Sequence, residues 1–165
     1  MRGIHHAVAL LLGVAATTAS ADDLSYRSFV GDSIGDKADH PIGCLYAYAA
    51  DKTGDHAAAL EILHRCVAQG NVWSMIWLAM LHENGQGVPK DLEASADLMR
   101  RGARMNDDAG YAPLARYHWG VALVEGRGVA ASEDEGLRWL RIAAAEGVRD
   151  AKDYLRARGE WHPSL

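Results

Sequence analysis

The chain has 165 residues and a formal net charge of −5 at pH 7. This length suits one domain, and the mild acidity gives no electrostatic reason to expect a nucleic acid or an anionic membrane as partner. No segment after the first 21 residues is long and apolar enough to span a bilayer.

The first residues have the pattern of an export signal. Arg2 precedes an apolar run over 7–16, and residues 19–21 read Ala-Ser-Ala, a small-x-small pattern that signal peptidases cleave. The apolar run is too short to remain as a membrane anchor. We therefore predict a signal peptide over 1–21, cleaved after Ala21, and a periplasmic or secreted mature protein.

Residues 22–39 are rich in Gly, Asp and Ser without a clear period, which favours an irregular N-terminal arm. A helix is expected from Pro41, because proline fits the first helical turn, and Gly54 ends it. The side chains expected on one face of this helix are Ile42, Leu45 and Ala49. A second helix is expected over 59–68, with Leu60, Leu63 and Val67 at helical spacing before Gly70.

Two further helix pairs follow. The apolar periodicity predicts helices over 73–84, 91–105, 112–125 and 133–146, and a terminal helix over 150–158.

Start and stop signals mark these helices. Gly85 and Gly126 can take positive φ at helix C-termini, and Asp91 is a good N-cap. Ser132 with Glu135 three residues on predicts a capping box.

The chain repeats itself. Residues 60–70 match residues 137–147 at a shift of 77, and residues 83–88 match residues 124–129 at a shift of 41. Three units result, each with a first helix, a turn and a second helix. Each pair leaves one apolar face uncovered, so stability must come from stacking on the next pair.

These units resemble the Sel-1-like repeat, a relative of the tetratricopeptide repeat. Gly-x-Gly-Val occurs at 85–88 and 126–129, Lys90-Asp91 follows the first of these, and Ala-Ala-Ala-Glu-Gly ends the third unit at 143–147. The first unit departs most, since it lacks Gly-x-Gly-Val.

The resemblance implies an all-α, right-handed α/α solenoid of about three antiparallel helix pairs plus a C-terminal capping helix. The repeat domain is expected over 40–158, with 159–165 as a tail.

Cys44 and Cys66 are the two cysteines. In an exported protein they favour a disulfide over the alternative of two buried reduced thiols. They lie on helices that must run antiparallel, with an axial mismatch of only about 3 Å. Cysteine-rich members of the family similarly bridge the two helices of a pair, so a structural role is implied.

Motifs for chemistry are scarce. The sequence has no Ser-x-x-Lys, no Gly-x-Ser-x-Gly and no His-Glu-x-x-His, and no two histidines lie four residues apart. We therefore expect no catalytic residue, no metal site and no cofactor. A β-lactam or cell-wall hydrolase is kept as the alternative from another class, because some cysteine-rich family members have been labelled β-lactamases.

A binding surface is the favoured functional prediction. In related solenoids the first helix of each pair lines the concave face, and large aromatic residues beside an arginine are typical anchors for a partner. The residues predicted to line this groove are Trp77, Met80, Arg116 and His118. The resemblance thus implies a non-catalytic protein- or peptide-binding scaffold of the envelope or secreted space, or a periplasmic regulator that binds an envelope receptor. Whether Trp77 is exposed or belongs to the core stays open at this point.

Overall fold

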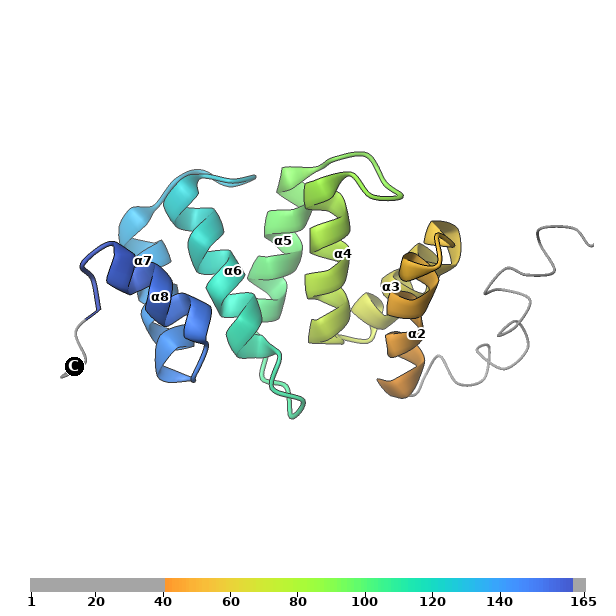
Figure 1. The fold of residues 1–165 in the computed structure, drawn as a ribbon, viewed down its shortest axis with the longest axis horizontal. Coiled ribbons are helices and arrows are strands. Elements are labelled where there is room, and N and C mark those ends of the chain that lie inside the picture. Colours follow the sequence, from red (N-terminus) through yellow and green to blue (C-terminus); the bar gives the residue numbers. More distant parts are fainter. Residues whose placement is uncertain (1–40, 162–165) are drawn as a thin grey trace, which may run out of the picture.

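The computed structural model describes residues 41–161. This part of the chain folds into seven helices that pack in sequential pairs, as the sequence predicts (Figure 1). The helices are α2 (Pro41–Lys52), α3 (His56–Ala68), α4 (Val72–Asn84), α5 (Leu92–Ala103), α6 (Ala112–Glu125), α7 (Glu133–Ala145) and α8 (Arg149–Ala157). The predicted signal peptide, the predicted arm and the last four residues of the predicted tail lie outside the described residues.

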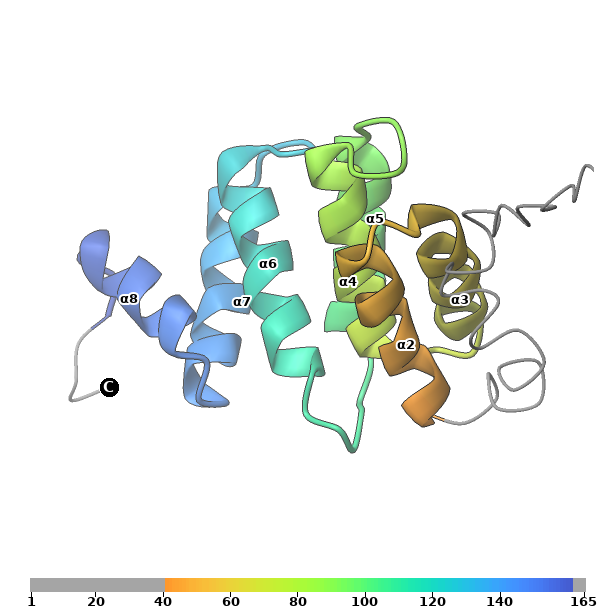
Figure 2. The ribbon, with the colours of Figure 1, turned by 45° about the vertical axis from the view of Figure 1, so that its right-hand side comes forward.

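The first helices of the pairs form one layer of the stack. Figure 2 shows α2, α4 and α6 toward the viewer, with α5 and α7 behind α4 and α6. One apolar core cluster runs from α2 to α6, and a second joins α6, α7 and α8. Because the pairs share these clusters, the apolar face of each helix pair packs against the next pair, as expected of a solenoid.

The turn signals explain most of the helix boundaries. Gly85 and Gly126 end α4 and α6 with φ of 69° and 66°, which confirms the predicted left-handed caps. Asp91 caps α5 through a 2.9 Å bond from the amide of Ala94. α3 begins three residues earlier than predicted, because the carboxylate of Asp55 caps it.

The predicted capping box at the start of α7 is wrong. Ser132 occupies the N-cap position, but its side chain makes no capping hydrogen bond. Glu135 does not reach back to it; its Oε1 lies 3.4 Å from Nε1 of Trp139, one turn further along the same helix. The Glu135 carboxylate therefore lies near the indole of Trp139 and not near the backbone amide of Ser132.

The predicted inner face of α2 is wrong at Leu45, while Ala49 is half-buried and the side chain of Ile42 lies outside what the structure describes. Cys44, Ala47 and Ala50 are buried, whereas the side chain of Leu45 is 51% exposed. The bridge to α3 turns Cys44 toward the core, and neighbouring residues on a helix lie about 100° apart. Leu45 and Tyr48 therefore face outward.

The predicted disulfide is confirmed in the structure. Cys44 and Cys66 are joined with an S–S distance of 2.11 Å and a Cα–Cα distance of 6.0 Å. Both cysteines are buried. The bond holds α2 on α3 in a first unit that lacks the Gly-x-Gly-Val turn.

The loops between first and second helices reach back to the preceding unit. Nε2 of Gln86 donates a 2.8 Å hydrogen bond to the buried carboxylate of Asp51, and Arg127 forms an ion pair with Glu83. Gln86 and Arg127 are the middle residues of the two Gly-x-Gly motifs. Asp51 and Glu83 are each the penultimate residue of a first helix, so the contact repeats along the stack.

The second glycine of each motif makes the closest approach between units. A Cβ built on Gly128 would lie 1.8 Å from the backbone oxygen of Leu92 at the start of α5. At Gly87 the corresponding atom would lie 2.7 Å from Cβ of His56, at the start of α3. Each loop therefore rests on the first turn of the preceding second helix, where only glycine fits.

Candidate binding surface

An aromatic strip crosses from α2 to α4. We define it by Tyr48, Trp73 and Trp77, together with Lys52. The rings of Trp73 and Trp77 are nearly parallel with centroids 6.0 Å apart, and Tyr48 meets Trp77 edge-on at 5.1 Å. Nζ of Lys52 lies 5.0 Å from the centroid of the Trp77 ring and 5.4 Å from that of Tyr48.

Helical spacing places these side chains together. Tyr48 and Lys52 are four residues apart on α2, as are Trp73 and Trp77 on α4, so each pair shares one face of its helix. Tyr48 is 47% exposed, while both tryptophans are half-buried and pack against the core. The strip is thus part core and part surface, and Nε1 of Trp77 is buried without a hydrogen-bond partner.

The strip continues into a groove at one end of the helices. This groove has a volume of about 510 Å³ and lies between the α3–α4 turn and the loop before α6. Its lining includes Trp73, Tyr111, Asp107 and Asp108. The carboxylate of Asp107 accepts hydrogen bonds from the amides of Tyr111 and Ala112, at 3.0 and 2.7 Å, and so fixes the start of α6.

Of the four residues predicted to line a partner groove, Trp77 lies in the strip and Met80 is half-buried against the same core cluster. The side chain of Arg116 instead makes hydrogen bonds within the fold. Its guanidinium donates to the backbone oxygens of Ala103 and Met105 at 3.0 and 2.9 Å, and to Glu146 at 2.6 Å. It satisfies carbonyls at the end of α5, and only 13% of its side chain is exposed.

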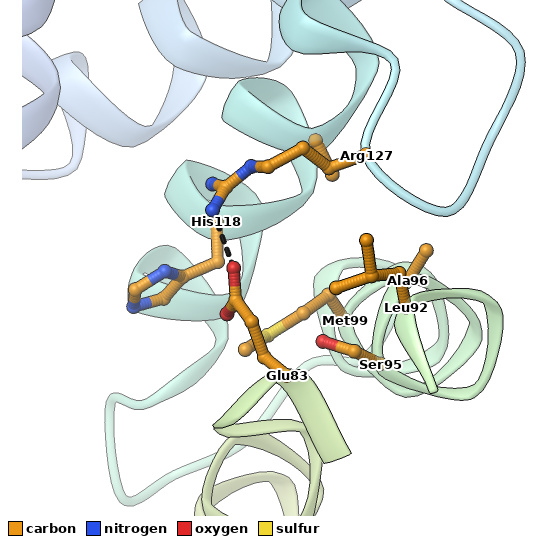
Figure 3. Close-up of a pocket in the computed structure, with 8 residues that line it drawn as sticks. Glu83, Leu92, Ser95, Ala96, Met99, His118 and Arg127 are labelled. Carbon is orange, nitrogen blue, oxygen red and sulfur yellow. Dashed lines mark hydrogen bonds and ion pairs between the residues drawn. The ribbon is translucent and has the colours of Figure 1, made fainter. Parts of the chain in front are cut away.

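His118 lies beside a separate, narrow cavity of about 20 Å³ between α4, α5 and α6. Glu83 and Arg127 form an ion pair at this cavity, and Ser95 lines it (Figure 3). Burial lowers the pKa of His118 below its ordinary value, and Arg127 adds to this effect while Glu83 opposes it. His118 is therefore held neutral near pH 7.

The cavity has little capacity for chemistry. Figure 3 shows the His118 ring and the Ser95 hydroxyl apart, with Glu83 between them. Within residues 41–161, no hydrogen bond joins these two side chains, and no group of three or more His, Cys, Asp or Glu residues could hold a metal ion. The volume is that of about one water molecule.

The groove predicted from the sequence leaves out three members of the strip, Tyr48, Lys52 and Trp73, and the groove beside the strip. Tyr48 and Lys52 have a usable signal, since residues four apart on a helix share a face. Their contact with Trp77 has no such signal, because it depends on how α2 and α4 are oriented in space.

The geometry is that of known repeat proteins. The sequence matches the Sel1 repeat family model over residues 74–107 and 113–148. A Sel1 repeat protein from Oxalobacter formigenes has a TM-score of 0.64 and 25% identity, with 79% of this chain and 98% of that chain covered. Among curated proteins, none matches the chain.

Two more distant structures share the fold. A protective antigen of uropathogenic Escherichia coli strains has a TM-score of 0.57 and 23% identity, covering 73% of this chain and 26% of that chain. Helicobacter pylori cysteine rich protein B has a TM-score of 0.55 and 18% identity, covering 79% of this chain and 90% of that chain. Within residues 41–161, no helix is long and apolar enough to cross a membrane.

Proposed function

Because the chain belongs to the Sel1 repeat family, we propose that it is a non-catalytic scaffold that binds a protein or peptide partner on the layer formed by α2, α4 and α6. The observation that carries this proposal is the aromatic strip. Tyrosine and tryptophan side chains are the commonest energetic anchors of protein interfaces.

The exposure of large apolar side chains supports the same surface. Five of them are exposed among the described residues, and two of these, Tyr48 in the strip and Tyr111 in the groove, belong to this surface. A third, Leu45, shares one face of α2 with Tyr48, three residues further on. Apolar side chains gathered at one place on a surface mark an interaction site more often than scattered ones do.

The groove predicted from the sequence shifts toward the first unit in this proposal. Trp77 remains its centre, and Met80 is half-buried against the same core cluster. His118 lines its own cavity rather than this groove, and Arg116 acts by positioning α6 on α5.

We place this scaffold in the periplasm or in the secreted space. The support is the export pattern over 1–21 and the Cys44–Cys66 bridge, since disulfides persist outside the reducing cytosol. A periplasmic regulator that contacts an envelope receptor is one form that such a scaffold takes.

The test compares two single variants of the mature protein. Tyr48→Ala removes an exposed anchor of the strip, and Ile142→Ala removes a similarly exposed side chain from α7. We expect envelope proteins captured by the wild type to be lost with Tyr48→Ala, with a cost of about 2 kcal/mol in affinity, and retained with Ile142→Ala. Equal retention by both variants would contradict binding at this face.

The hydrolase alternative is tested by an activity assay on the same purified protein. We expect the mature protein not to hydrolyse a chromogenic β-lactam above the buffer rate, because no nucleophile is paired with a base at the His118 cavity. Reproducible turnover that one substitution abolishes, with the fold intact, would favour the hydrolase over the scaffold.

A further inference from the structure

The aromatic strip has opposite charges at its two ends. Lys52 lies at one end, over the rings of Tyr48 and Trp77. Asp107 and Asp108 lie at the other, in the groove that Trp73 lines. A surface with this polarity favours an occupant whose own charges are arranged in the complementary order.

The ammonium group of Lys52 can bind a further carboxylate. Its Nζ lies 3.7 Å from Oδ2 of Asp51, which is an ion pair too long for a hydrogen bond, while the other oxygen of that carboxylate contacts Gln86 and His56. The side chain of Lys52 is 51% exposed. The two rings beneath the ammonium group hold it above the strip rather than let it extend into solvent.

The groove at the other end suits a cation. Trp73 and Tyr111 supply aromatic walls, and no lysine or arginine is among the residues that line it. Both oxygens of Asp107 are engaged by backbone amides, whereas Asp108 is exposed. A lysine or arginine side chain would therefore meet aromatic faces and the carboxylate of Asp108.

The strip spans no more than a few residues of an extended occupant. The steps from Lys52 to Trp77 and from Trp77 to Trp73, where the groove begins, cover about 11 Å at most, and an extended chain rises about 3.3 Å per residue. We propose that the strip binds an extended peptide segment that carries an acidic side chain at Lys52 and, beyond Trp73, a basic side chain in the groove beside Asp108. This inference rests on the proposed function and specifies its ligand.

The experiment uses a soluble library of random heptapeptides and the mature protein. Wild-type protein is expected to enrich peptides that carry one acidic and one basic residue. Lys52→Glu should shift the enrichment toward peptides with two basic residues, and Asp108→Lys toward peptides with two acidic residues. Each single reversal should weaken the best wild-type peptide by about 3- to 10-fold, as partly exposed ion pairs and cation–π contacts do.

One double variant and two control variants make the comparison decisive. The double variant Lys52→Glu with Asp108→Lys should regain peptides of mixed charge, because the occupant can reverse its direction. Lys90→Glu and Asp134→Lys, both exposed and outside the strip and groove, should leave the enrichment unchanged.

The outcomes separate the two proposals. If Tyr48→Ala abolishes the enrichment but neither charge reversal alters it, the peptide with one acidic and one basic side chain is ruled out. The proposal of a binding scaffold would then still stand. If the wild-type protein enriches no peptide, the proposed peptide ligand is ruled out. The capture of envelope proteins described above tests the scaffold proposal separately. A dimer in analytical ultracentrifugation that Tyr48→Ala dissociates would assign the strip to a second copy of the chain, and would also overturn the peptide proposal.

Discussion

Single glycines decide how closely successive units of the stack approach. At Gly128 the obstacle is a backbone carbonyl, which cannot rotate away as a side chain can. Gly110 also has positive φ, at 79°, but a Cβ built there would meet nothing within 4 Å. The two positions therefore separate the cost of the left-handed backbone from the cost of the contact between units.

Gly128→Ala is expected to lower the free energy of unfolding by about 3 kcal/mol or more, because the loop must leave the first turn of α5. Gly110→Ala should cost only about 1–2 kcal/mol, the penalty of the left-handed conformation alone. Urea denaturation of both variants and the wild type measures this. Similar losses in the two variants would mean that the approach to Leu92 is not a constraint on the fold.

At the scale of the helix, α2 is held mainly by its bridge. Over residues 43–52, the buried side chains besides Cys44 are short: Ala47, Ala50 and the carboxylate of Asp51. Small side chains bury little apolar surface, so α2 gains less from packing than α4, whose buried side chains include Met75, Ile76 and Leu78.

Reduction of the Cys44–Cys66 bond is expected to destabilise the first unit by about 3 kcal/mol, given a sequence separation of 22 residues. Hydrogen exchange should show faster exchange in α2 and α3 after reduction, with α6 and α7 little changed. The double variant Cys44→Ala with Cys66→Ala is the control for side effects of the reductant. Labelling of both thiols in native, unreduced protein would contradict the bridge itself.

The sequence predicts helices well where local signals agree with packing. The second and third pairs are found nearly to the residue, because Gly85, Gly126 and Asp91 combine turn chemistry with periodic apolar positions. α2 is misread because its outward residues, Leu45 and Tyr48, are as apolar as a core face would be. Periodicity identifies an apolar face without saying whether another element covers it.

The binding surface is less predictable than the helices for a related reason. Trp77 stands out by residue type, and Arg116 stands out equally, yet the structure uses Arg116 to satisfy the end of α5. A sequence does not reveal which carbonyls lack partners, since these depend on where neighbouring helices end. The same holds for the place of Lys52 above Trp77.

At the scale of the whole molecule, α4, α5 and α6 meet around His118. Burial there favours the neutral imidazole, so the folded chain takes up a proton at lower pH than the unfolded chain does. The unfolded state then binds more protons as the pH falls below about 6.5. Acidification should therefore weaken the stack, and stability should return as the pH rises.

His118→Gln should remove this contribution. Between pH 7.5 and 5.5 the free energy of unfolding of the wild type is expected to fall more than that of the variant. His64→Gln, at an exposed position on α3, should keep the pH dependence of the wild type. The measurement is urea denaturation at several pH values. Parallel curves for the wild type and His118→Gln would contradict a buried, neutral imidazole.

The contact between a loop and the preceding first helix also bears on how such a chain can grow. Asp51 and Glu83 accept from the next loop, but the matching position in α6, again the penultimate residue, is Val124. A gene duplication that copies the middle unit in place would supply both an acceptor and a donor at the new junction. A unit added behind α7 would bring its donor against a valine. The array can therefore lengthen from within, whereas at its C-terminal end, which α8 covers, the position that would accept from a further loop is a valine.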